Sequence, residues 1–262
     1  MFKFVALLLW IGAIQLTQAA EPKPKPLRAL LILGGCCHDY AKQMTILKQG
    51  IESRARVSVD ITYTADSSTQ ARFNLYENPN WAHGYDVVIH DECSSDVKEM
   101  PYVQNILAAH KTIPAVNLHC AMHCYRTGTD DWFKFVGIQS SAHGPQEPIA
   151  IHFVDEQNPI TKGLADWTTI REELYNNIKV FETAHALARG KQMVKQRDGS
   201  TKDVEYVVAW ANDYDNTRVF STTIGHNNET VADARYLDLV MRGLLWACGK
   251  LDGNYLKSGN KE

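Results

Sequence analysis

The sequence has no excess of charge of one sign and no repeated or low-complexity segment. Its 27 lysines and arginines against 30 aspartates and glutamates leave a net charge of −3, so no nucleic-acid partner is predicted. Gly34-Gly35 is followed by neither a Gly-Lys-Ser/Thr ending nor a G-x-G-x-x-G run, so no nucleotide cofactor is predicted. The 262 residues, 45% of them hydrophobic, suffice instead for the core of one large α/β domain.

The N-terminus has the pattern of a targeting signal. Lys3 precedes an apolar run over residues 4–16, and small residues follow up to Ala19 and Ala20. This pattern predicts a signal peptide over residues 1–20, cleaved near Ala19 or Ala20. A run of about 13 apolar residues is short for a membrane span, which needs roughly 20. The mature protein is therefore predicted to be secreted or periplasmic, without a membrane span, and to begin with a Pro/Lys-rich tail over residues 21–26.

Six cysteines in an exported chain could form disulfides, but their spacing is not that of a disulfide scaffold. Cys36 and Cys37 are adjacent, and neighbouring cysteines pair only with strain. Cys93 and Cys248 are interpreted as small buried residues. Cys120 lies in the most motif-like segment of the chain. The pairing of the six is left open by the sequence.

Strand and helix signals alternate along the first half of the chain. Apolar runs predict strands over 27–33, 57–62, 87–89 and 115–118, with helices over 41–54 and 97–110 and a loop over 63–84. Later strands are predicted over 149–154, 178–186, 205–210 and 218–224, with a hairpin tip over 190–203 and a closing amphipathic helix over 232–248. This order predicts a doubly wound, mainly parallel α/β sheet in one domain over residues 27–251, followed by a flexible tail over 252–262.

Four of the ten histidines share a setting, because each lies beside small or turn-forming residues: His38, His119, His143 and His226. Loops that follow parallel strands gather at one edge of the sheet, so these side chains are predicted to converge there. Taken singly, a loop histidine is more often a surface or capping residue, and it is the shared setting that favours a site. Glu173, in the segment 172–175, adds a carboxylate. The histidines that lack this setting are interpreted as structural: His83, His90, His110, His152 and His185.

His123 follows His119 by four residues, the spacing of a two-histidine metal site on a helix. No glutamate stands beside His119, so the pair is not a zincin helix. His123 is therefore a weaker candidate ligand than the four histidines above.

Taken together, these segments resemble the ThuA-like (trehalose utilisation) family. The pieces that carry the resemblance are Leu33 to Asp39, Val116 to His119, the His143 segment, Asn158 to Leu164, Glu172 to Tyr175, Arg218 to His226 and Gly243 to Ala247. The resemblance implies a flavodoxin-like fold related to class I glutamine amidotransferases. It also implies a role in sugar metabolism, beside oxidoreductases that make 3-keto sugars. The positions that match its polar motifs are His38, Asp39, His119, His143, Glu173 and His226. The chain departs from the motif at Cys120 and around His123.

With the sugar substrate that the resemblance implies, these residues suit a hydrolase or lyase that acts on disaccharides or glycosides, including 3-keto sugars. Histidines with a carboxylate can hold a divalent metal, zinc first among them, through His38, His119, His143 and His226. Without metal, His119 and Glu173 could act as acid and base. His38 and Asp39 are further catalytic candidates, and His143, Tyr175 and Asn227 are predicted to contact the sugar.

Two other functions stay open. The first is a non-catalytic sugar-binding or scaffold protein, in which Trp81, Trp132, Trp167 and Trp210 could stack on sugar rings. The second is a hydrolase with Cys120 as its nucleophile, as in the amidotransferases. Leu118 and Met122 stand where the sharp turn of a nucleophile elbow favours small residues, and this disfavours Cys120 as a nucleophile.

Overall fold

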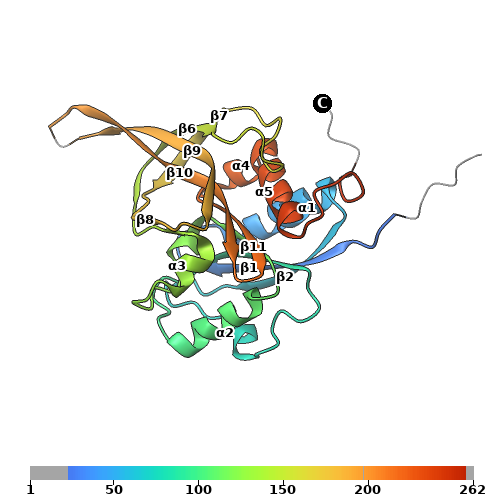
Figure 1. The fold of residues 1–262 in the computed structure, drawn as a ribbon. Coiled ribbons are helices and arrows are strands. Elements are labelled where there is room, and N and C mark those ends of the chain that lie inside the picture. The colour runs from blue at the N-terminus through green and yellow to red at the C-terminus, as the bar shows by residue number, and fades with distance from the viewer. Residues whose placement is uncertain (1–22, 197, 258–262) are drawn as a thin grey trace, which may run out of the picture.

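The computed structural model describes residues 23–196 and 198–257 (Figure 1). The predicted signal peptide lies outside them. A nine-stranded sheet with the order β2-β1-β3-β4-β11-β10-β9-β6-β7 forms the centre of the molecule. No helix among the described residues is long and apolar enough to cross a membrane.

One half of the sheet is parallel. It consists of β2 (Val57–Thr64), β1 (Leu27–Gly35), β3 (Val87–Cys93), β4 (Ala115–Leu118) and β11 (Thr217–Thr222). Strands β3 and β4 are buried along their whole length, because helices cover both faces of a doubly wound sheet and continuous apolar runs suit this position. The predicted doubly wound, mainly parallel fold is confirmed.

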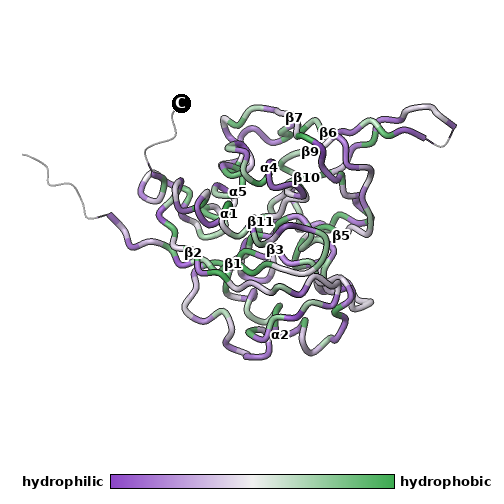
Figure 2. Tube along the Cα trace, turned by 180° about the vertical axis from the view of Figure 1, so that it is seen from behind, coloured by the Kyte–Doolittle hydropathy of each residue, from purple (hydrophilic) through white to green (hydrophobic). Residues whose placement is uncertain are grey.

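Helices pack on both faces of this half. Helices α1 (Tyr40–Arg54), α4 (Asn228–Val231) and α5 (Ala234–Ala247) cover one face, and α2 (Met100–His110) and α3 (Asp131–Val136) cover the other. Alternate residues of β1 pack into the cores on opposite faces of the sheet. Leu31 and Leu33 belong to the core under α1 and α5, whereas Leu30 and Ile32 belong to the core under α2 and α3. Figure 2 shows the hydrophobic segments gathered inside these layers.

The other half is antiparallel: β10 (Thr201–Tyr214), β9 (Ala184–Lys195), β6 (His143–Phe153) and β7 (Trp167–Tyr175). The β9–β10 hairpin projects from the body of the molecule (Figure 1). A separate small sheet pairs β5 (Ile138–Gln139) with β8 (Lys179–Val180). Strand β7 was not predicted, because its charged Arg171, Glu172 and Glu173 hide the alternation typical of a strand.

Several local expectations need correction. Most of the predicted hairpin tip is strand, because β9 runs to Lys195 and β10 begins at Thr201. His143 lies at the start of β6 and not in a loop. The predicted flexible tail is ordered in part, because Leu256 bridges Ala55 and Lys257 N–H donates to Arg54 O at 2.9 Å. Residues 119–123 form a short 3₁₀ helix, η2.

Candidate functional site

Three histidines converge at the C-terminal edge of the parallel strands. His38 follows β1, His119 follows β4 and His226 follows β11. The ring centroid of His38 lies 4.7 Å from that of His119 and 4.8 Å from that of His226. One ring nitrogen from each of the three lies within 4.8 Å of the others. Residues separated by nearly the whole chain thus share one site, as the parallel topology predicts.

The glycines before His38 allow the chain to turn into this site. Gly35 has a φ of +99°, and a Cβ there would lie 2.1 Å from the carbonyl oxygen of Cys93. Both ring nitrogens of His38 are buried and have no hydrogen-bond partner. Burial lowers the pKa of His38, so its imidazole is neutral near pH 7. A buried polar side chain without a partner marks a position that a ligand or ion can satisfy.

His119 has a defined tautomer. Its Nδ1 lies 2.6 Å from the carbonyl oxygen of Thr223, and a carbonyl can only accept, so Nδ1 carries the hydrogen. Its Nε2 therefore keeps a lone pair, which faces the hydroxyl of Tyr175 at 3.2 Å. The backbone φ of His119 is +41°, so the residue stands in the sharp turn at the end of β4. An oriented nitrogen of this kind suits a metal ligand or a base.

A buried glutamate holds the loop of His226. Glu172 is 0% exposed and accepts the backbone N–H groups of His226 at 3.0 Å and Asn227 at 3.1 Å. From the other side, Gln43 donates to the carbonyl oxygens of Gly225 and His226. These contacts hold β7 and α1 against the loop after β11.

Glu173 lies at the centre of the histidines. Its carboxylate is 3.5 Å from His119 Nε2, 3.4 Å from His226 Nδ1 and 3.6 Å from His143 Nε2. Burial would raise the pKa of Glu173, but the imidazoles of His119 and His226 beside it outweigh burial and hold this pKa well below its usual value. In return, the carboxylate raises the pKa of His226. Gln146 donates to both Glu173 Oε1 at 3.1 Å and His226 Nε2 at 2.9 Å.

The remaining predicted site residues take different places. The side chain of His143 is 42% exposed at the rim, and Tyr175 is buried against His119. Asp39 is not part of the cluster, because its carboxylate caps α1 and forms an ion pair with Lys42. Asn227 donates its side-chain amide to the carbonyl oxygen of Arg171. A cavity of about 410 Å³ opens beside the site and is lined by residues 37–39 and 226–229.

His123 does not join the cluster. Its ring stacks on Tyr175 with centroids 4.0 Å apart, and its Nε2 lies 2.8 Å from Ser140 Oγ. In a 3₁₀ helix, side chains three apart are aligned and those four apart are not, which is why the spacing from His119 misleads.

Cys120 is poorly placed as a nucleophile. It is 5% exposed, and His119, not Cys120, has the positive φ of the turn after β4. The neighbouring Cys93 thiol and burial raise the pKa of the Cys120 thiol well above its usual value, outweighing the opposite effect of His38 beside it. The thiolate that nucleophilic attack requires is therefore disfavoured.

The residues interpreted as structural lie away from the site. His90 and His110 are buried and face each other at 2.8 Å, with Glu92 on the other nitrogen of His90. His152 and His185 pair with aspartates at the surface. The four tryptophans named for sugar stacking are each at most 8% exposed: Trp81, Trp132, Trp167 and Trp210.

Three residues of the site were missed from the sequence: Gln43, Gln146 and the backbone of Thr223. Glutamine in a helix or strand carries no signal of its own. Their roles arise from contacts between segments far apart in the chain, such as Gln43 with Gly225, and no local pattern reports these.

The sheet, parallel in the half whose strand ends carry the site, is that of a doubly wound, flavodoxin-like α/β protein. The sequence model of the ThuA family, described as trehalose utilisation, matches residues 28–247, and the chain belongs to this family. A comparison with curated proteins finds no significant match.

Solved structures show the same fold. A ThuA-like protein from Parabacteroides merdae is 20% identical, with a TM-score of 0.67 over 90% of this chain and 94% of that chain. A ThuA-like protein from Bacteroides uniformis is 17% identical, with a TM-score of 0.63 over 90% and 95%. A β-galactosidase from Rahnella sp. R3 is 12% identical, with a TM-score of 0.52 over 87% of this chain and 32% of that one.

Proposed function

We propose that this protein is a hydrolase or lyase that acts on disaccharides or glycosides, including their 3-keto forms, at the cluster of His38, His119, Glu173 and His226. The observation that carries the proposal is the position of Glu173, whose carboxylate contacts His119, His226 and His143 at 3.4–3.6 Å. Membership of the trehalose-utilisation family supports a sugar as the substrate.

We further propose that the cluster binds a divalent metal, with zinc as the first candidate. The residues fit such an ion, because His38 has two buried nitrogens without a partner and His119 keeps a lone pair on Nε2. Imidazole nitrogens with one carboxylate are typical zinc ligands, so His38, His119, His226 and Glu173 would hold it. A bound metal would polarise a carbonyl or activate water.

The protein's own groups supply acid–base chemistry. A ketone at C3 of a sugar acidifies the neighbouring C–H, and loss of that proton allows the glycosidic oxygen to leave. In a site without metal, the Nε2 lone pair of His119 can accept this proton. Gln146 donates to His226 Nε2, so the hydrogen of the neutral His226 ring lies on Nδ1, beside Glu173. His226, whose pKa Glu173 raises, can donate a proton to the leaving oxygen. General acid–base catalysis contributes about 10²–10⁴-fold.

Turnover of a panel of 3-keto disaccharides and glycosides tests the proposal, followed by product analysis. His119→Ala, His226→Ala and Glu173→Gln should each lose at least about 10²-fold in kcat. His152→Ala is the matched control, since His152 pairs with Asp166 at the surface, and it should keep full activity. Unchanged turnover of every substrate in both histidine variants would refute the assignment.

Elemental analysis of the purified protein tests the metal separately. About one equivalent of zinc or another transition metal per chain is expected. The His38→Ala variant should lose this metal. Protein that is active and free of transition metal would remove the Lewis-acid version and leave the acid–base version standing.

We also propose that the protein works outside the cytoplasm. The disulfide between Cys36 and Cys37 supports this, because disulfides persist in oxidising compartments. N-terminal sequencing of the protein from the native cell envelope or medium should begin near residue 21, and a chain that begins at Met1 would contradict it.

A further inference from the structure

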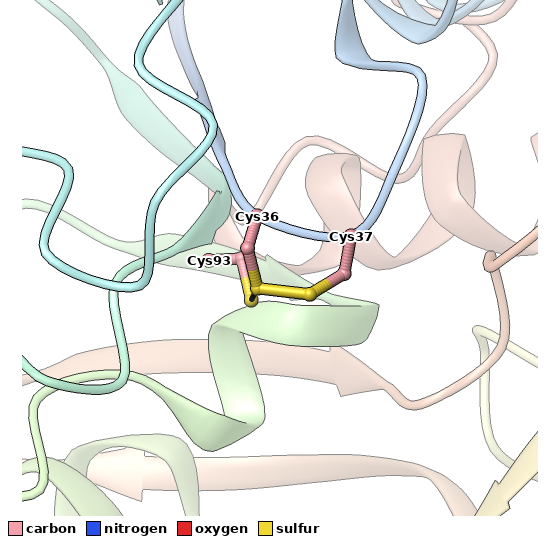
Figure 3. A group of neighbouring side chains, drawn as sticks. All are labelled: Cys36, Cys37 and Cys93. Atoms are coloured by element: carbon pink, nitrogen blue, oxygen red, sulfur yellow. Dashed lines mark hydrogen bonds between the residues drawn. A yellow bond between two sulfur atoms is a disulfide. The ribbon is translucent and has the colours of Figure 1, made fainter.

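A group of three cysteines lies directly beside the histidine cluster. Cys36 and Cys37 form a disulfide in the loop after β1, and the free thiol of Cys93, at the end of β3, lies 3.4 Å from Cys36 Sγ. Figure 3 shows the side chain of Cys93 next to the Cys36 sulfur, with Cys37 further along the loop. A disulfide and a free thiol in contact are the two reactants of thiol–disulfide exchange.

We propose that these cysteines form an exchange site in which Cys36 can pair with either Cys37 or Cys93. The Cys93 sulfur forms a bond to Cys36 Sγ, and the bond between Cys36 and Cys37 breaks with its electron pair on Cys37. The proton of the Cys93 thiol ends on Cys37. One disulfide and one thiol are present before and after the step, so no oxidant or reductant is consumed.

The backbone permits the second pairing. Cys36 N–H donates to the carbonyl oxygen of Cys93 at 3.4 Å, so the two backbone segments are already neighbours. A disulfide between Cys36 and Cys93 therefore needs no large backbone shift. Cys37, by contrast, has a φ of +85°, a conformation that residues other than glycine rarely adopt. Loss of its bond to Cys36 frees this residue to leave that conformation.

Burial makes the two pairings chemically different. Cys36 is 9% exposed and Cys93 is 3% exposed, whereas Cys37 is exposed and lines the cavity next to His38 and His226. Exchange therefore moves the free thiol from the interior to the cavity. There it can exchange with a small disulfide, forming a mixed disulfide on Cys37 and releasing one small thiol. This inference stands independently of the proposed sugar chemistry.

Disulfide mapping of the oxidised wild-type protein tests the proposal. After equilibration with a trace of reduced glutathione, the protein is blocked with N-ethylmaleimide in acid and digested with trypsin. Pairing of Cys36 with Cys37 leaves a loop inside peptide 29–42, whereas pairing with Cys93 joins peptide 29–42 to peptide 73–98. We expect both forms, with maleimide on Cys37 in proportion to the joined peptides. Looped peptide alone, with Cys93 free throughout, would overturn the proposal.

Two variants sharpen the test. Cys37→Ala removes the competing partner, so treatment with one equivalent of diamide should join Cys36 to Cys93 nearly completely; a product without this link would also overturn the proposal. Cys93→Ala should abolish maleimide labelling of Cys37. Cys248→Ala is the matched control, a free cysteine elsewhere in the fold, and should leave the distribution of the wild type unchanged.

Discussion

The same substitution at the adjacent residues Glu172 and Glu173 should lower mainly the stability at Glu172 and mainly the turnover at Glu173. Glu172 is fully buried and accepts the backbone N–H groups of Gly225, His226 and Asn227 at 3.0–3.4 Å. Glutamine has the same shape but no charge, and its NH₂ group would face one of these donors. A hydrogen bond to a charged group contributes about 1.5–3 kcal/mol, so Glu172→Gln should cost about 3 kcal/mol of unfolding free energy.

In a domain of this size, 1 kcal/mol shifts Tm by roughly 2–4 °C. Glu172→Gln should therefore lower Tm by roughly 6–12 °C in a thermal melt followed by circular dichroism. Glu173→Gln is the matched control. Its histidine contacts are longer, at 3.4–3.6 Å, so we expect a smaller loss of Tm together with loss of turnover. A Tm for Glu172→Gln within measurement error of the wild type, or a larger loss in Glu173→Gln, would refute this reasoning.

Three further results are expected. Burial lowers the pKa of His123 to about 3, so below pH 6.5 the unfolded chain takes up a proton that the folded chain does not. This lowers the free energy of unfolding by about 2 kcal/mol from pH 7 to pH 5. Urea unfolding of His123→Phe should therefore show a smaller loss of stability between these pH values than the wild type. A Cβ on Gly243 would lie 2.3 Å from the ring of Phe220, so Gly243→Ala should lower the free energy of unfolding in urea by about 1–3 kcal/mol. Gly253→Ala is its control: a Cβ there meets nothing within 4 Å, so its stability should be unchanged. Zinc at 100 times its Kd should stabilise the wild type by about 2.7 kcal/mol and His38→Ala much less; equal shifts in both would exclude His38 as a ligand.

The convergence of the histidines could be anticipated because it follows from topology. His38, His119 and His226 each follow a strand of the parallel half, and parallel strands end at one edge. Glu173 was a candidate from the sequence, but the contacts that bring it to these rings were not. Glu172, on the same strand, binds the loop after β11 and so holds β7 beside the site, and Gln146 joins because β6 pairs with β7. Both contacts depend on the path of strands that the local pattern of residues 143–175 does not reveal.

The alternation of apolar strands and amphipathic helices is local information, and it was sufficient to identify the doubly wound domain and the family resemblance. The pairing of Cys36 with its neighbour, the stacking of His123 on Tyr175 and the role of Asp39 as a helix cap came from the packed structure alone. The stacking of His123 depends on the packing of two distant segments against each other. The disulfide and the cap are local contacts, but they require particular backbone conformations, such as the φ of +85° at Cys37, which the residue types alone do not specify.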